Sequence, residues 1–226
     1  FPSINITNVL TRAIYPIQCQ LQDQQDKLKN SFIQFIRLSV FLIFPLMIGV
    51  CVLSKPLVLL FLTEKWLPCV PFLQIFCITY MFQPVHTANL NAIKAMGKSD
   101  IFLKLEIIKK IVGMSLLLST MWFGVMAMAY SLLVSCVLSQ IINSWPNKRL
   151  LGYGYLEQLR DFMPGVILAV VMGICVYFIG YINLPNIIVL IIQVIVGATI
   201  YIVMSIVFKL ESFLYLWNMV KTYLKK

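Results

Sequence analysis

Five polar residues share one face of an otherwise apolar segment in the first half of the chain. They are Gln83, His86, Thr87, Asn91 and Lys94. At 100° per residue of α-helix, their side chains fall within an arc of about 140°. Together, these amides, hydroxyl, imidazole and ammonium groups can hydrogen-bond a polar ligand and stabilise a negative charge. The same face could instead hydrogen-bond to neighbouring helices, and both interpretations stay open at the level of sequence.

Four cationic residues lie inside or at the edge of apolar segments, with few acidic residues near them. They are Arg12, Arg37, Lys94 and Lys109. Phosphate binds Arg through paired hydrogen bonds and binds Lys as a point charge. We therefore expect a cavity open to the cytoplasm in which these cations bind an anionic ligand. In the alternative interpretation, all four residues anchor helices at the membrane surface.

The two patterns together give seven candidate substrate-binding residues. They are Arg12, Arg37, Gln83, His86, Asn91, Lys94 and Lys109. Glu106 precedes Lys109 and Lys110 by three and four residues, which is the spacing of a local ion pair on a helix. Such a pair would still leave positive charge near the membrane boundary.

No residue pattern indicates catalysis or a bound cofactor. The sequence has no HExxH, GxSxG or Gly-rich phosphate-binding motif, and its single histidine leaves no second imidazole for a metal site. The six cysteines lie mostly within apolar runs and form no CxxC pair, so we expect them to pack as small hydrophobic side chains. We therefore predict no catalytic residues, no metal and no cofactor, and a protein that is not an enzyme.

The elements that position these residues follow from composition and charge. The chain is 61% hydrophobic and 12% charged, whereas a soluble domain has roughly 25% charged residues. Lys and Arg fall mainly in alternate gaps between apolar runs, as the positive-inside rule describes for a polytopic membrane protein. Topology and attraction to anionic lipids account for the net charge of +10, and we expect no nucleic-acid partner. The segments expected in the cytoplasm lie near 17–31, 94–106, 146–161 and the C-terminus.

The apolar runs predict six full membrane spans after a partial first one, and hence an all-α polytopic membrane protein. The uncharged runs are 38–54, 66–93, 111–147 and 162–208. We expect turns to divide the last two runs, at Phe123-Gly124 and at Asn183-Leu184-Pro185-Asn186. Beyond residue 209, apolar and basic residues separate onto two faces, which predicts an amphipathic helix on the cytoplasmic surface.

The run at 64–74 carries a resemblance to a known family. It reads EKW-LP-x-VP-x-LQ. The motifs found with it are Tyr15-Pro16, Leu21-Gln22-Asp23, Phe44-Pro45-Leu46-Met47, Gln83-Pro84, Asn89-Leu90-Asn91 and Lys94-Ala95-Met96-Gly97-Lys98-Ser99-Asp100. In order and spacing, they resemble the Wzx-type polysaccharide transporters of the colanic-acid-exporter-like branch. These belong to the multidrug/oligosaccharidyl-lipid/polysaccharide (MOP) exporter superfamily, together with the MATE pumps. The resemblance covers residues 6–110.

The resemblance implies a MOP/MATE-like fold of two six-helix lobes around a central cavity, with two further C-terminal transmembrane helices. Because the chain starts at Phe1 within an apparent helix, we expect a C-terminal portion in which the N-terminal lobe is missing. The implied parts are a second-lobe bundle at 1–145, a cytoplasmic loop at 146–161, a C-terminal helix pair at 162–208 and an amphipathic tail at 209–226.

The resemblance also implies an activity. This is transfer of an undecaprenyl-diphosphate-linked oligosaccharide from the cytoplasmic to the periplasmic leaflet of the bacterial inner membrane, by alternating access. The product would enter lipopolysaccharide or other surface-polysaccharide biosynthesis. The implied partners are membrane lipids, the lipid-linked oligosaccharide, the missing N-terminal lobe, a polysaccharide polymerase and glycosyltransferases.

Three other interpretations of the sequence are open to different degrees. A MATE-like drug or cation antiporter would need an acidic residue at mid-membrane depth, and the full spans have none. A transferase acting on polyprenyl phosphates would need an acidic pair for Mg²⁺, and the close pairs Asp23/Asp26 and Glu157/Asp161 have spacings suited to a solvated loop or helix end. A membrane accessory subunit without transport activity of its own is compatible with the sequence.

Overall fold

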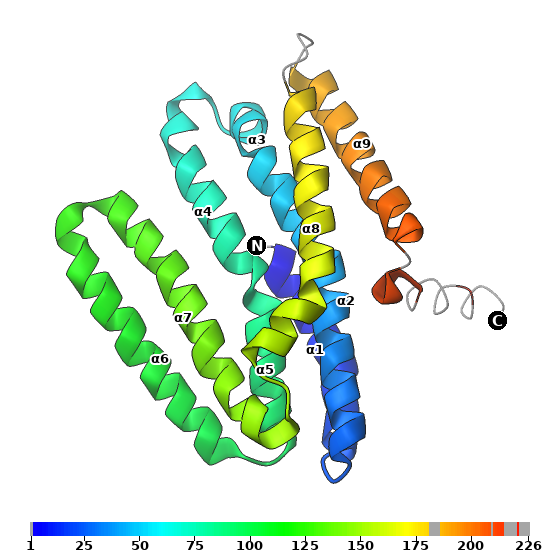
Figure 1. The fold of residues 1–226 in the computed structure, drawn as a ribbon. Helices are drawn as coiled ribbons and strands as arrows, with labels where there is room; N and C mark the ends of the chain where they lie inside the picture. Colours follow the sequence, from blue (N-terminus) through cyan, green and yellow to red (C-terminus); the bar gives the residue numbers. More distant parts are fainter. Residues whose placement is uncertain (1, 181–185, 209, 215–220, 222–226) are drawn as a thin grey trace.

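The computed structural model describes residues 2–180, 186–208, 210–214 and 221, and these residues form helices joined by short connections (Figure 1). The α-helices are α1 Pro2–Gln20, α2 Gln25–Val52, α3 Ser54–Phe61, α4 Val70–Met81, α5 Gln83–Ala95, α6 Ser99–Thr120, α7 Val125–Leu151, α8 Tyr155–Ile179 and α9 Asn186–Val207. Two 3₁₀ segments, η1 Glu64–Cys69 and η2 Met121–Phe123, complete the order. The predicted all-α class is confirmed, since the described residues contain no strand.

Five helical stretches in the described part of the chain are long and apolar enough to cross a membrane. They are Gln25–Val52, Glu64–Ala95, Val125–Leu151, Tyr155–Ile179 and Ile187–Val207. The sixth predicted full span corresponds to α6, whose 22 residues give a length of about 33 Å and match the hydrocarbon core. The first half of α6 carries several charged residues, so α6 is not apolar enough to count among these five stretches.

The turn predicted at Phe123-Gly124 is confirmed. The helix α6 ends at Thr120, η2 follows, and Gly124 adopts a φ of 94° immediately before α7 begins. That backbone conformation costs glycine little and strains other residues, so the glycine fixes the reversal. The second predicted turn, at 183–186, lies outside the described residues except for Asn186. Most of the predicted amphipathic tail lies outside them as well.

The segment 146–161, predicted as a loop, is mainly helical. The helix α7 continues to Leu151, where Gly152 ends it in the left-handed conformation at a φ of 58°. The helix α8 then begins at Tyr155, and the Glu157 carboxylate accepts a hydrogen bond from the Gly154 N–H. The basic residues that suggested a loop are Lys148 and Arg149, which occupy the last turn of α7. Cations are favoured there by the helix dipole.

The helix α2 is the centre of the packing, in contact with α1, α4, α5, α8 and α9. Its side chains Phe32, Phe35, Phe44 and Met47 are almost completely buried. Close approach of α8 to α2 depends on Gly173, because a Cβ added there would lie 2.6 Å from Ile48 Cγ2. Small residues at helix contacts are a usual means of packing in membranes.

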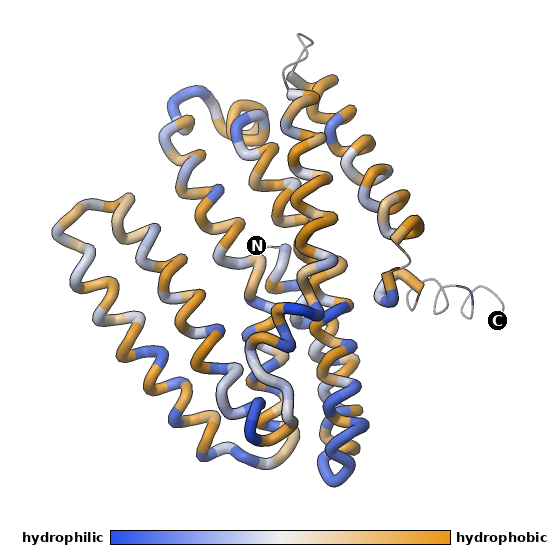
Figure 2. Tube along the Cα trace, viewed as in Figure 1, coloured by the Kyte–Doolittle hydropathy of each residue, from blue (hydrophilic) through white to orange (hydrophobic). Residues whose placement is uncertain are grey.

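The bundle has two helical pairs at opposite edges (Figure 1). The α6–α7 pair stands beside α4 and α5, and the α8–α9 pair stands toward the opposite edge, where α8 packs against α2. Hydrophobic residues cover the middle of the helices, while hydrophilic residues gather where α1 joins α2 and near the α5–α6 connection (Figure 2). This distribution is that of a bundle with apolar sides and polar ends.

Candidate functional site

A pocket of about 470 Å³ opens between α4, α5, α6 and α7, and we call it the polar groove. Its polar lining from α5 and α6 consists of Gln83, His86, Thr87, Glu106, Lys109 and Lys110. The break between α4 and α5 falls at Phe82, and Pro84 occupies the first turn of α5. Proline fits the first turn of a helix and cannot continue a preceding one, so it sets the direction of α5 at this point.

The polar groove has more positive than negative charge. The ammonium of Lys109 donates a hydrogen bond to the Glu106 carboxylate and forms an ion pair with it. Lys110 also lines the groove, and the structure shows no ion pair for it within the described residues. One carboxylate and two ammonium groups therefore leave a net positive charge, whether or not His86 is protonated.

His86 connects the groove to α7. Its Nε2 atom lies 3.3 Å from Cys136 Sγ, and its Nδ1 atom lies 3.4 Å from Asn143 Nδ2. Asn143 Oδ1 is buried without a hydrogen-bond partner in the described part of the chain. The Asn143 Nδ2 group can donate to an unprotonated Nδ1, while Nε2–H donates to Cys136 Sγ, whose thiol donates to the Thr79 carbonyl oxygen. Asn143 then fixes the tautomer of His86.

A second polar cluster on α5, α7 and α8 holds helices together. Gln158 donates to Asn89 Oδ1 at 2.8 Å and accepts from Asn89 Nδ2 at 2.9 Å. Asn147 donates to the same Asn89 oxygen at 2.7 Å. All three side chains are completely buried. On α5, Asn89 therefore bonds to neighbouring helices, Gln83 lines the polar groove, and His86 does both.

Asn91, Arg12 and Lys94 lie away from the polar groove. The Asn91 amide Nδ2 is 3.5 Å from Thr11 Oγ1, which joins α5 to α1 directly beside Arg12. Arg12 and Lys94 are both exposed, and the Lys94 ammonium lies 4.1 Å from the centre of the Phe102 ring. A cation over an aromatic face is attracted by the ring quadrupole.

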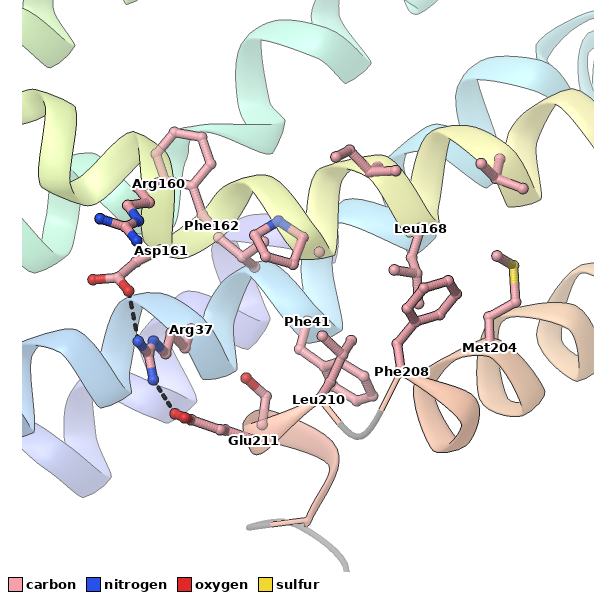
Figure 3. Close-up of a pocket in the computed structure, with 16 residues that line it drawn as sticks. Arg37, Phe41, Arg160, Asp161, Phe162, Leu168, Met204, Phe208, Leu210 and Glu211 are labelled. Carbon is pink, nitrogen blue, oxygen red and sulfur yellow. Dashed lines mark hydrogen bonds and ion pairs between the residues drawn. The ribbon is translucent and has the colours of Figure 1, made fainter.

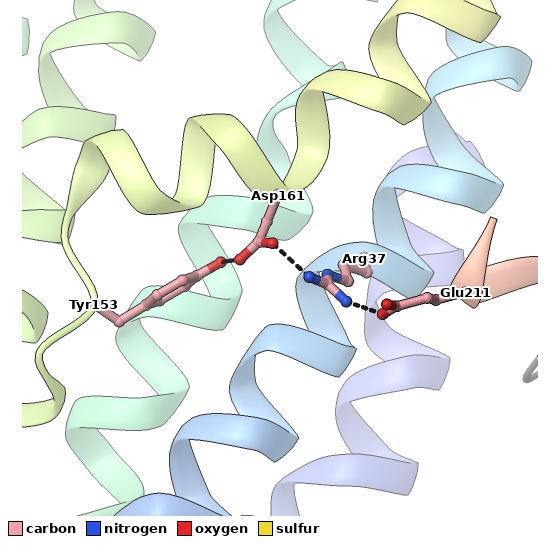
Figure 4. A network of polar contacts seen from close by, with 4 residues as sticks. All are labelled: Arg37, Tyr153, Asp161 and Glu211. Carbon is pink, nitrogen blue, oxygen red and sulfur yellow. Dashed lines mark hydrogen bonds and ion pairs between the residues drawn. The ribbon is translucent and has the colours of Figure 1, made fainter. Parts of the chain in front are cut away.

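Arg37 lies in a different pocket, between α2, α8 and α9 (Figure 3). Its guanidinium donates to Asp161 Oδ1 at 2.6 Å and also donates to the Glu211 carboxylate. The Tyr153 hydroxyl donates to the other Asp161 oxygen at 2.6 Å (Figure 4). Burial and this hydrogen bond raise the pKa of Tyr153, so the phenol stays protonated.

The structure therefore brings together Gln83, His86 and Lys109 from the predicted set, and it separates Arg37 from them. The sequence reasoning did not single out Ser135, Cys136 and Ser139, which line the groove from α7. Ser135 and Ser139 stand four residues apart and so share one helix face. That spacing was the available signal in the sequence. Small neutral residues in an apolar run do not stand out as binding candidates until the helices that pack against them are known.

Comparison with known proteins agrees with the resemblance seen in the motifs. A family model described as "Polysaccharide biosynthesis protein" matches residues 1–71. An uncharacterized membrane protein in the cps region of Klebsiella pneumoniae is 25% identical over 210 residues, which cover 89% of this chain and 42% of that protein. The lipopolysaccharide biosynthesis protein WzxC of Escherichia coli K12 is 24% identical over 185 residues, covering 76% of this chain and 37% of WzxC.

A third relative, the teichuronic acid biosynthesis protein TuaB of Bacillus subtilis 168, is 20% identical over 177 residues, covering 78% of this chain and 37% of TuaB. This chain thus spans about two fifths of the length of the curated relatives it matches. The fold is shared with the lipid II flippase MurJ in its inward closed conformation, with a TM-score of 0.73 at 14% identity. That match covers 89% of this chain and 44% of MurJ. These comparisons confirm the family resemblance, and they show that this polytopic membrane chain is similar to membrane proteins of polysaccharide biosynthesis, WzxC among them.

Proposed function

We propose that this chain takes part in moving a lipid-linked oligosaccharide across the bacterial inner membrane for surface-polysaccharide biosynthesis. The observation that carries the proposal is the polar groove, where Gln83, His86 and Lys109 meet inside an otherwise apolar bundle. The names of the relatives point to polysaccharide assembly, and the shared fold is that of a flippase.

The groove has the chemistry that such a headgroup needs. A polyprenyl-diphosphate sugar must carry about two negative charges past a hydrocarbon core roughly 30 Å thick. An unpaired charge in that core costs several kcal/mol or more. The ammonium groups of Lys109 and Lys110 would offset the phosphate charge, while Gln83 and the hydroxyls of Ser135 and Ser139 would bond to sugar hydroxyls. The lipid tail would stay in the bilayer.

We further propose that the exposed Arg12, with Asn91 and Lys94 nearby on α5, lines the route of the headgroup outside the groove. These residues share the α1–α5 side of the bundle. Of the seven predicted binding residues, Arg37 has the least support, because two carboxylates already neutralise it.

Transport by alternating access, with the second lobe closing against an N-terminal lobe, remains part of this proposal. So does a cytoplasmic position for 17–31, 94–106, the α7–α8 connection and the C-terminus. Glycosyltransferases would supply the transported lipid, and a polymerase would consume it. The MATE-like alternative is disfavoured by the groove itself, since its carboxylate Glu106 is paired with Lys109 and would not attract an organic cation.

The test replaces Lys109 and Lys110 singly with Gln in the intact transporter and measures surface polysaccharide. We expect each variant to lower export about tenfold, equivalent to roughly 1.4 kcal/mol, because each removes one charge facing the phosphate. Lys104→Gln is the matched control, since Lys104 lies on the same helix outside the groove. Normal export in both groove variants, with normal membrane insertion, would contradict the proposal.

A further inference from the structure

The pocket that contains Arg37 has polar and apolar ends, and we call it the lateral pocket. It has a volume of about 630 Å³ and lies between α2, α8, the end of α9 and residues 210–212 (Figure 3). Its charged residues are Arg37, Arg160, Asp161 and Glu211. Its other lining side chains include Phe41, Leu168, Met204 and Phe208. A charged end joined to an apolar chamber matches an amphiphilic ligand, which has a charged headgroup and an apolar tail.

The charges of the described residues that line the lateral pocket balance, unlike those in the polar groove. Two guanidinium groups face two carboxylates. Arg37 already pairs with both Asp161 and Glu211. Arg160 has no hydrogen bond or ion pair from its side chain in the described part of the chain, and the Glu211 side chain is 76% exposed. The unpaired Arg160 guanidinium and the accessible Glu211 carboxylate thus lie on either side of the ion pair between Arg37 and Asp161.

The charged end lies at the level expected for lipid headgroups. Arg160 and Asp161 belong to the second turn of α8, and Glu211 follows the end of α9 at Val207. Both helices can cross a membrane, and their ends meet on this side. Along α8, Val171 lies 11 residues beyond Arg160, a distance of about 16 Å. The apolar part of the pocket therefore extends toward the interior of the bilayer.

We propose that the lateral pocket binds a zwitterionic phospholipid, phosphatidylethanolamine. The lipid phosphate binds Arg160 through paired hydrogen bonds, and the lipid ammonium binds Glu211. One acyl chain lies along Phe41, Leu168 and Met204. The bound lipid fills the space between α2 and α9 and holds the segment at 210–214 against α2.

Charge complementarity selects this lipid over anionic ones. A net negative headgroup would add charge beside Asp161 and Glu211, with only Arg160 free to compensate. A zwitterion offers one phosphate and one ammonium to the free cation and the accessible anion. The same argument disfavours a polyprenyl diphosphate here, so the lateral pocket is separate from the groove proposed for transport and its occupancy does not depend on that proposal.

The test measures lipid binding to the purified chain by native mass spectrometry in detergent. The probes are palmitoyl-oleoyl phosphatidylethanolamine, the matching phosphatidylglycerol, and undecaprenyl phosphate, each titrated separately. We expect phosphatidylethanolamine to bind at least fivefold more tightly than phosphatidylglycerol. Arg160→Gln lowers its affinity at least fivefold, and Glu211→Gln removes the preference between the two phospholipids. The matched control is Arg149→Gln, because Arg149 lies on α7 beside Trp145 and outside the pocket.

Two outcomes would overturn the proposal. Equal affinity of the wild-type chain for phosphatidylethanolamine and phosphatidylglycerol would show that the balanced charges select nothing. Arg160-dependent binding of undecaprenyl phosphate that exceeds the binding of phosphatidylethanolamine would assign the lateral pocket to a transported lipid. Glu211→Gln alters a mostly exposed side chain, so the result does not rest on Arg160→Gln alone.

Discussion

The polar groove and the lateral pocket both place charged residues beside apolar helices, yet the two differ in how those charges are compensated. In the groove, Lys110 adds to an ion pair between Lys109 and Glu106, and positive charge remains. In the lateral pocket, Arg37 lies between two carboxylates, and the charges of the described lining residues sum to zero. Cations in a membrane segment are therefore available to an anionic ligand only when they outnumber the carboxylates beside them.

The largest effect that would sharpen this comparison is a charge reversal in the groove. Lys110→Glu places a second carboxylate near Glu106, which repels an anionic headgroup. We expect polysaccharide export to fall more than about a hundredfold, roughly 2.7 kcal/mol in the barrier. Arg37→Gln, in the lateral pocket, should change export less than about threefold. Comparable losses in the two variants, at equal protein levels in the membrane, would break the distinction between the pockets.

A smaller effect concerns stability in the lateral pocket. Asp161→Asn removes the more buried partner of Arg37, whose carboxylate side chain is only 19% exposed. We expect a loss of about 1–2 kcal/mol in the free energy of unfolding, because a half-buried guanidinium loses a charged acceptor. Glu211→Gln should cost less than about 0.5 kcal/mol, since exposed ion pairs contribute little.

Unfolding by sodium dodecyl sulfate in mixed micelles gives both free energies. If Glu211→Gln proves as costly as Asp161→Asn, then burial does not govern the strength of this network. The groove offers a second buried case, because the Lys109 side chain is 15% exposed and Lys109→Gln should cost about as much as Asp161→Asn.

The smallest predicted effect is the pH dependence of Tyr153. Its pKa is raised above the ordinary value of 10.0 by burial and by the bond to Asp161. Above pH 10 the unfolded state has lost this proton and the folded state keeps it, so stability falls as pH rises toward the raised pKa. The contribution is complete below pH 10. Tyrosinate absorbance should show phenols that resist titration, and Tyr153→Phe should lower their number by one.

Much of the fold could be predicted from the sequence because the bilayer imposes simple rules. Runs of apolar residues specify helices, and Gly124 specifies the reversal between α6 and α7. The segment 146–161 was predicted as a cytoplasmic loop because it is the charged gap between two apolar runs, and the structure shows that most of it is helical. Lys148 and Arg149 occupy the last turn of α7, where the helix dipole stabilises cations.

The candidate site was only partly predictable. The periodicity of α5 placed Gln83 and His86 on one face, and the structure puts both in the polar groove. Periodicity could not show that Asn89 bonds to Gln158, which lies 69 residues further along the chain. Nor could it show that Ser135 and Ser139 face the groove, since neutral side chains in an apolar run give no signal about their neighbours.

The sequence alone determined the membrane environment, the helical class and the family resemblance, because hydrophobicity and motif order are properties of the chain itself. Tertiary structure alone decided which charges are free. Asp161 and Glu211 are far from Arg37 in sequence, yet they neutralise it, because electrostatic energy depends on distance in space and on burial. Positions along the chain specify neither quantity.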